Sequence, residues 1–210
     1  MSGRKENTDR SETLPAGALI LAAGFSRRFG GIKLHAKLSN GLTVFEQTLT
    51  NISAATDHIL VVTRADLADS ITRAVHSRAP LAQITVCPDS DKGMGNTLAH
   101  GVQQIEDWRA CMICLGDMPF VNTDTYRQLL IYSNPHTIAV PRYEQKIGNP
   151  ISFGHDFFEQ ISLLQGDAGA RRLLQQYPDA VHYVDVNDKA ILQDIDTPED
   201  IQRWDTTSLD

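Results

Sequence analysis

Apolar, β-branched runs alternate with amphipathic stretches along almost the whole chain, and this alternation is the strongest constraint on its fold. The runs predict strands over residues 18–21, 58–63, 83–87, 111–115, 137–140, 150–153 and 182–186. The stretches predict helices over residues 44–55, 66–77, 94–105, 123–132, 155–163, 168–177 and 198–204. The early strands are continuous apolar runs, which is typical of strands covered by helices on both faces. The sequence therefore predicts an α/β fold: a single-domain, doubly wound, mostly parallel sheet of the Rossmann-like kind.

The predicted domain spans residues 16–206, and residues 1–15 are predicted to form a disordered tail because they are mostly polar and mixed in charge. That tail lacks the apolar stretch of a secretory signal, and no apolar run is long enough to span a membrane. The formal net charge of -7 disfavours binding to nucleic acid or to an anionic membrane. We therefore expect a cytoplasmic protein with no nucleic-acid or membrane partner.

Two of the three cysteines, Cys111 and Cys114, form a C-x-x-C pair. An odd number of cysteines argues against a disulfide framework. Strand residues three positions apart point to opposite faces, and no second Cys or His pair lies nearby to complete a zinc site. We interpret the two cysteines as small core residues rather than as a redox or metal-binding pair.

The segment after the first predicted strand combines small residues with positive charge in the sequence LAAGFSRRFGGIK, residues 21–33. Small residues at a strand end let backbone N–H groups approach an anion. Arg27, Arg28 and Lys33 form the densest cationic cluster of the chain, and guanidinium groups grip phosphate with two parallel hydrogen bonds. The spacing matches neither the dinucleotide fingerprint nor the Walker loop. We predict a phosphate-binding loop of another kind, rather than a simple turn, with ligand contacts from Leu21, Ala22, Ala23, Gly24, Ser26, Arg28 and Lys33.

One carboxylate, Asp117, directly follows the fourth predicted strand in the sequence Gly-Asp-Met-Pro, residues 116–119. Mg²⁺ in proteins is typically held by one or two carboxylates together with phosphates and water. If the first and fourth strands are neighbours, Asp117 and the phosphate loop open into one crevice at the carboxyl edge of the sheet. Considered alone, Asp117 is better interpreted as a turn or cap residue, so the predicted magnesium site depends on the first and fourth strands being neighbours.

Residues 87–98 again join a strand to a helix through a loop of small residues. Such a loop could line a base or ribose site, or it could form just a turn. In the first interpretation, the nucleotide contacts come from Pro88, Asp89, Gly95, Asn96 and Thr97.

The sequence Asp-Ile-Asp-Thr-Pro, residues 194–198, has two interpretations that do not exclude each other. Thr197 and Pro198 suit the first positions of a last helix. Asp194 or Asp196 could in addition point into the crevice as a second metal ligand beside Asp117, and we select Asp196. No histidine occurs in a metal-ligand spacing such as H-x3-H, so zinc chemistry has no support.

Together these segments resemble the MobA-like family of nucleotidyltransferases. Residues 21–33 match the family's opening signature L-A-[AG]-G-x-S-x-R-x-G-x-x-K, and residues 116–119 resemble its G-D-M-P metal motif. Residues 93–98 and 166–171 resemble the G-M-G-x-S-L and G-D-x-G-A-R segments of the molybdenum cofactor cytidylyltransferases (MocA-like), with Thr97 in place of Ser. Ala23 also resembles this cytidylyl branch more than the guanylyl branch. Asn149 departs from it, because the branch often has His there.

The resemblance implies a fold of the nucleotide-diphospho-sugar transferase type and a Mg²⁺-dependent transfer of a nucleotidyl group to a phosphorylated acceptor, with release of pyrophosphate. In the cytidylyl branch the donor is CTP and the acceptor is the molybdenum cofactor (molybdopterin), which a molybdoenzyme could then receive. Arg28, Lys33 and Asp117 would be the catalytic residues. Asp117 would hold Mg²⁺ with Asp196, Arg28 would hold the β- and γ-phosphates, and Lys33 would neutralise charge on the α-phosphoryl group.

Two alternatives stay open at this point. A nucleotidyltransferase for a sugar phosphate or a terpenoid precursor would share the opening signature and the chemistry, and would differ in its acceptor. A chaperone would carry the pterin cofactor to a molybdoenzyme without catalysing transfer. The complete set of Arg28, Lys33 and Asp117 argues against binding alone.

Overall fold

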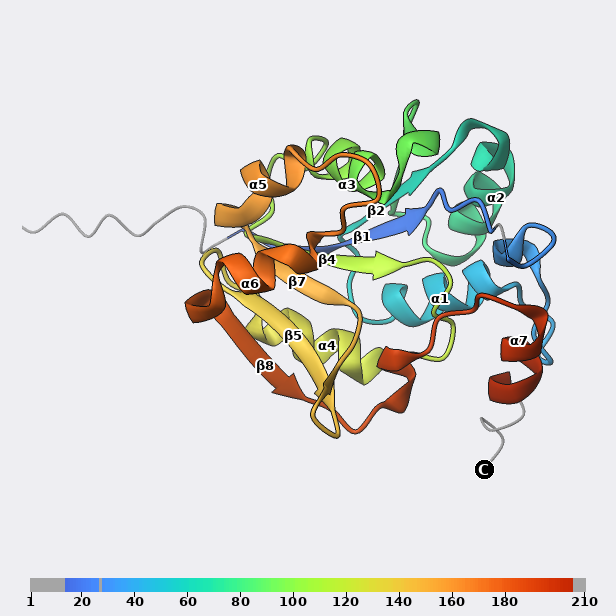
Figure 1. Ribbon diagram of the computed structural model, residues 1–210. Coiled ribbons are helices and arrows are strands. Elements are labelled where there is room, and N and C mark those ends of the chain that lie inside the picture. Colours follow the sequence, from blue (N-terminus) through green and yellow to red (C-terminus); the bar gives the residue numbers. More distant parts are fainter. Residues whose placement is uncertain (1–13, 27, 206–210) are drawn as a thin grey trace, which may run out of the picture.

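The computed structural model describes residues 14–26 and 28–205, which are built around one eight-stranded mixed sheet (Figure 1). The strand order is β3-β2-β1-β4-β7-β5-β6. The remaining strand, β8, pairs in parallel with β5. The strands are β1 (Ala16–Ala22), β2 (Ile59–Thr63), β3 (Gln83–Val86), β4 (Ala110–Leu115), β5 (Ile138–Tyr143), β6 (Lys146–Ile147), β7 (Ile151–Gly154) and β8 (Val181–Asp185).

The first half of the sheet is parallel, as the apolar runs predict. β1 is central and pairs in parallel with β2 on one side and β4 on the other. Leu19, fully buried, lies opposite Leu60 and Ile113. β7 is antiparallel to both of its neighbours, β4 and β5. The predicted α/β class with a mostly parallel sheet is therefore confirmed.

The chain between β5 and β7 forms a hairpin. β5 and β6 pair in antiparallel fashion around Glu144 and Gln145, whose φ angles are 46° and 66°. Positive φ at both central residues is the geometry that two-residue hairpin turns require. The structure thus assigns residues 142–147 to the sheet.

The helices cover both faces of the sheet (Figure 1). One core cluster unites side chains of α1, α2 and α4 with one face, and a second unites α3, α5 and α6 with the other. The helices are α1 (Val44–Ser53), α2 (Ala68–Arg78), α3 (Met94–Val102), α4 (Thr123–Tyr132), α5 (Phe158–Ser162), α6 (Leu173–Gln176) and α7 (Pro198–Asp205). Cys114 belongs to the first cluster and Cys111 to the second, so the two buried free thiols face opposite ways, as predicted. Burial raises the pKa of both thiols.

Two predicted helices differ from the structure in extent. Residues 168–177 do not form a continuous helix: Ala170–Arg172 is a 3-10 turn, followed by α6. The backbone is extended at Gly169, with φ of -79° and ψ of 160°, so the helix does not begin before this turn. Residues 155–163 likewise begin with a 3-10 turn, His155–Phe157, before α5.

The end of the predicted tail is fixed by Arg109. Its Nη1 donates to the Leu14 carbonyl at 2.7 Å, and its backbone N–H donates to the Pro15 carbonyl at 2.9 Å. Residues 1–13, the rest of that predicted tail, lie outside the described residues, as does residue 206. Within the described residues, no helix has both the length and the apolar character to cross a membrane.

The buried carboxylate of Asp188 ties α4 to the segment after β8. It accepts hydrogen bonds from the Asn122 N–H at 2.9 Å, the Thr125 hydroxyl at 2.7 Å and the Ala190 N–H at 3.0 Å. Hydrogen bonds to a charged group are worth about 1.5–3 kcal/mol, and buried donors left without a partner add to the loss. We predict that Asp188→Ala lowers the free energy of unfolding by about 3 kcal/mol, measured by urea denaturation.

The matched control is Asp124→Ala, on the same helix. Asp124 is 79% exposed in its ion pair with Arg127, and such a surface pair is worth about 0–1 kcal/mol. Equal losses in the two variants would contradict the structural role of Asp188.

Candidate active site

The carboxyl ends of β1 and β4 lie side by side, as the predicted crevice requires. Leu21 pairs with Leu115, and the Gly116 N–H donates to the Leu21 carbonyl at 3.0 Å. A Cβ on Gly116 would lie 2.9 Å from that carbonyl oxygen, so glycine permits the approach. Asp117 follows directly and is therefore held beside the loop that leaves β1.

The loop after β1 turns back on itself through Ser26. Ser26 has a φ of 49°, its carbonyl accepts from the Phe29 N–H at 3.0 Å, and its Oγ accepts from the Lys33 N–H at 3.3 Å. These contacts bring Lys33 back toward the end of β1. Arg27, which the sequence includes in the cationic cluster, lies outside the described residues.

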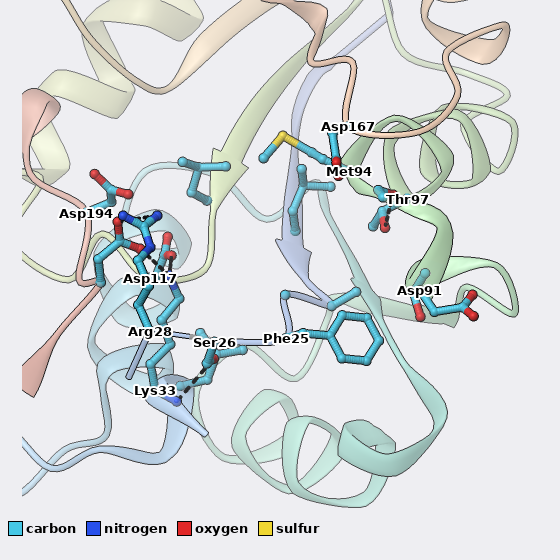
Figure 2. A pocket seen from close by; sticks show the side chains of 18 residues that line it. Phe25, Ser26, Arg28, Lys33, Asp91, Met94, Thr97, Asp117, Asp167 and Asp194 are labelled. Carbon is cyan, nitrogen blue, oxygen red and sulfur yellow. Dashed lines mark hydrogen bonds and ion pairs between the residues drawn. The ribbon is translucent and has the colours of Figure 1, made fainter. Parts of the chain in front are cut away.

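Lys33 joins two carboxylates (Figure 2). Its Nζ lies 2.5 Å from Asp117 Oδ2 and 3.2 Å from Asp196 Oδ1. The Lys33 and Asp117 side chains are only 12% and 14% exposed, so water screens this pair poorly. Arg28 completes the cluster from the solvent side, with Nη2 2.8 Å from Asp196 Oδ2 and its side chain 76% exposed.

Burial and neighbouring charges shift the pKa values of Asp117 and Lys33. Burial raises the pKa of Asp117, the negative charge of Asp194 adds to the effect, and Lys33 opposes it only in part. Burial alone lowers the pKa of Lys33, but the attraction of Asp117 and Asp196 outweighs it, so the pKa of Lys33 is raised. Lys33 is therefore a fixed positive charge at neutral pH.

A segment from the end of the chain completes this side of the site. The Ile195 N–H donates to the Asp117 carbonyl at 3.0 Å, and the Ile195 side chain is fully buried. Asp194 and Asp196 flank this anchor, and both line the cavity. The Asp200 carboxylate accepts from the Thr197 N–H at 2.8 Å, and α7 begins at Pro198, as predicted.

A cavity of about 420 Å³ opens between this cluster and the start of α3. Ten of the residues singled out from the sequence line it: Leu21, Ala23, Gly24, Ser26, Arg28, Lys33, Thr97, Asp117, Asp194 and Asp196. Five predicted nucleotide contacts lie outside the lining: Ala22, Pro88, Asp89, Gly95 and Asn96. Ala22 is fully buried, and Asn96 Oδ1 accepts a hydrogen bond from the Gly166 N–H at 2.8 Å. Contact of these five with a nucleotide stays a prediction.

Sequence reasoning did not select several residues that line the cavity. Phe25 stands at a variable position of the opening signature, and the Arg64 guanidinium lies 4.3 Å from the centroid of its ring. Asp91 and Met94 lie in the loop and helix start at residues 87–98. Asp167 lies in the G-D-x-G-A-R segment, which was the signal that could have identified it.

Asp117 has the features of a metal ligand. Its Oδ1 is buried and has no hydrogen-bond partner within the described residues. An orphaned carboxylate oxygen beside a cavity suits a hard cation such as Mg²⁺. No group of three or more His, Cys, Asp or Glu side chains there forms a complete metal site. The orphaned oxygen of Asp117 would therefore suit such an ion, with further ligands from a bound phosphate and water. The Asp196 oxygens already contact Lys33 and Arg28, and the role of Asp196 as second metal ligand stays a prediction.

Comparison with known proteins agrees with this geometry. The family model described as "MobA-like NTP transferase domain" matches residues 18–181. "Purine catabolism protein PucB" of Bacillus subtilis is 34% identical over 189 residues, which is 87% of this chain and 92% of that protein.

A "probable molybdenum cofactor guanylyltransferase" of Methanosarcina acetivorans is 29% identical over 147 residues, 69% of this chain and 64% of that protein. A crystal structure of Rv0371c from Mycobacterium tuberculosis H37Rv in complex with manganese has a similar fold, with a TM-score of 0.76 and 23% identity. That alignment covers 92% of this chain and 99% of the other. Because the family model spans most of the chain, this protein belongs to the MobA-like NTP transferase family and is a nucleotidyltransferase.

Proposed function

We propose that this enzyme transfers a cytidylyl group from CTP to the phosphate of the molybdenum cofactor, with Mg²⁺ as the metal ion, and releases pyrophosphate. The observation that carries the proposal is the buried contact of Lys33 with Asp117 at the cavity, with Arg28 beside it. This arrangement offers two fixed cations and an orphaned carboxylate oxygen, which are the groups that a triphosphate and its metal ion need. We place the enzyme in the cytoplasm, where its unpaired cysteines would stay reduced.

Ala23 supports CTP as the donor. It lines the cavity at the end of β1, and at this position of the signature it resembles the cytidylyl branch. GTP is the main alternative to CTP as the nucleotide donor, because the relative from Methanosarcina acetivorans is named a guanylyltransferase. The choice of molybdenum cofactor as acceptor is supported by that relative's name and by the segments at residues 93–98 and 166–171. A molybdoenzyme could receive the product.

The chemistry needs no protein base. In the transfer, a phosphate oxygen of the acceptor attacks the α-phosphorus of the donor, and the bond from that phosphorus to pyrophosphate breaks. A phosphate monoester has its second pKa near ~6, so the acceptor is largely dianionic at neutral pH. The enzyme therefore acts by positioning the two substrates and by neutralising charge.

The residues divide this work. Arg28, the more exposed cation, would hold the β- and γ-phosphates, and Lys33 would neutralise charge that develops on the α-phosphoryl and leaving oxygens. Asp117 and Asp196 would hold Mg²⁺, which supplies further neutralisation of the phosphate oxygens when it is bound. Small residues of the loop, Ala23 and Gly24, would let backbone N–H groups approach the phosphates.

We predict that CTP with Mg²⁺ raises the melting temperature of the protein more than GTP, UTP or ATP at the same concentration. A ligand that binds the folded state at about 100 times its Kd stabilises it by about 2.7 kcal/mol, which a thermal-shift assay resolves. In the control, each nucleotide is tested with EDTA. The rise in melting temperature should then be smaller.

A larger shift with GTP would instead assign the enzyme to guanylyl transfer, and equal shifts would remove the base assignment. Pyrophosphate release then tests the acceptor, with molybdopterin, glucose 1-phosphate and 2-C-methylerythritol 4-phosphate compared side by side. Turnover with a sugar or terpenoid precursor alone, or with none of the three, would contradict the proposed acceptor.

We predict that Lys33→Ala lowers kcat by on the order of 100-fold or more, because a preorganised charge at the reacting phosphate is lost. The measurement is steady-state pyrophosphate release. Lys37→Ala is the matched control: Lys37 lies four residues away, is 64% exposed and is outside the cavity lining. Intact turnover in Lys33→Ala would refute the role assigned to Lys33.

We predict that Asp117→Asn weakens Mn²⁺ binding to the CTP complex at least tenfold, because the metal ion loses a charged oxygen ligand. Electron paramagnetic resonance of Mn²⁺ measures this binding without turnover. Asp124→Asn, an exposed aspartate on α4, serves as the control. Equal Mn²⁺ affinity in the two variants would place the metal elsewhere.

A further inference from the structure

A loop opposite the cationic cluster is locked against the start of α3. The Gly95 N–H donates to the Gly166 carbonyl at 2.7 Å, and the Gly166 N–H donates to Asn96 Oδ1 at 2.8 Å. A Cβ on Gly93 would lie 2.3 Å from the Gly166 carbonyl carbon, so the two segments meet backbone to backbone. Residues 93–96 and 165–168 therefore form one unit, and its residues Gly93, Met94 and Asp167 line one wall of the cavity.

Asp167 stands on this wall with a free carboxylate. It lines the cavity, its side chain is exposed, and it makes no hydrogen bond or ion pair within residues 14–26 and 28–205. Figure 2 shows Asp167 beside Met94 and Thr97, across the cavity from Arg28 and Asp117. Its oxygens face water in the cavity and are available to a ligand group that donates a hydrogen bond.

The cations of the cavity lining lie on one side. Arg28 and Lys33 are found there together with Asp117, Asp194 and Asp196, whereas Asp91 and Asp167 on the other side have no cation beside them in the lining (Figure 2). The phosphates of a substrate are therefore attracted to the side of Arg28 and Lys33 and repelled from the side of Asp91 and Asp167. The part of a substrate that reaches Asp167 is therefore uncharged, and a carboxylate accepts strong hydrogen bonds from N–H or O–H groups.

We propose that Asp167 is a specificity-determining residue that accepts a hydrogen bond from an N–H or O–H group in the uncharged part of a substrate. We further propose that Asn96 is the positioning residue that holds the Asp167 loop in place. Both statements rest on the proposed function, in which a nucleotide and a phosphorylated acceptor share this cavity. The donor group can belong to the nucleoside or to the ring system of the acceptor, and the experiment distinguishes these sources.

The test compares Asp167→Asn with the wild type and with Asp179→Asn, an exposed aspartate outside the cavity lining. Asn keeps the shape of Asp but loses the charge and one acceptor. A charge-assisted hydrogen bond is worth enough to raise the KM of one substrate by about 10-fold or more, with kcat changed less than about twofold. Calorimetric titration of CTP·Mg²⁺ without acceptor gives the Kd of the nucleotide separately.

Each outcome is decisive. A weaker Kd for CTP assigns the contact to the nucleoside, and an unchanged Kd with a raised KM for molybdopterin assigns it to the acceptor. Unchanged values for both substrates, in a wild type that turns over normally, would overturn the role of Asp167 alone. A wild type that neither binds CTP nor releases pyrophosphate would overturn the proposed function and this proposal together.

The role of Asn96 has its own pair of variants. Asn96→Ala removes the oxygen that accepts from the Gly166 N–H, and it should reproduce the selective rise in KM of Asp167→Asn. Asn96→Asp keeps an acceptor at that point and adds a negative charge in the first turn of α3, which a helix start tolerates, so its KM should rise less than that of Asn96→Ala. Equal defects in both variants, or a loss of kcat and melting temperature without a change in KM, would show a merely structural role.

Discussion

The site depends on one backbone hydrogen bond, from the Gly116 N–H to the Leu21 carbonyl. It joins β1 and β4 at their carboxyl ends. Glycine is needed at this position, because a side chain on residue 116 would collide with the Leu21 carbonyl oxygen. Asp117 is the next residue, so its position follows from the pairing of β1 with β4 rather than from its own contacts. The Asp117 carbonyl in turn accepts from Ile195, which brings the last segment of the chain to the same edge.

The position of the charged cluster therefore follows from the backbone fold, and the fold does not depend on the cluster. Lys33 and Asp196 are 163 residues apart in sequence, and they meet only because the fold brings their two segments to the same edge of the sheet. Removing charges from water is costly, so a nearly buried pair such as Lys33 and Asp117 contributes little net stability. In the proposed function its value would lie in chemistry, because folding meets the cost of burying the charges before any substrate arrives.

The sequence predicted the parts of this site that depend on short-range patterns. Apolar runs identified the strands, and the loop at residues 21–33, predicted from its small residues and cations to bind phosphate, lies at the cavity. The sequence did not predict that β7 runs antiparallel, because the pattern of a strand tells which faces are buried and not which strand lies beside it. It also did not predict the contact of Asn96 with Gly166, because that contact joins residues 70 positions apart.

Lys33 has a consequence for how the site meets ions in solution. The Lys33 ammonium group already contacts the carboxylates of Asp117 and Asp196. Because it belongs to the same chain, its effective concentration at these carboxylates does not change when the protein is diluted. In the proposed function, a free divalent cation would have to share these carboxylates with a counter-ion that already offsets part of their charge. A triphosphate would offer Lys33 another anion and so leave more of that charge to the metal ion. The carboxylates would then bind a metal ion more readily with the nucleotide present than without it.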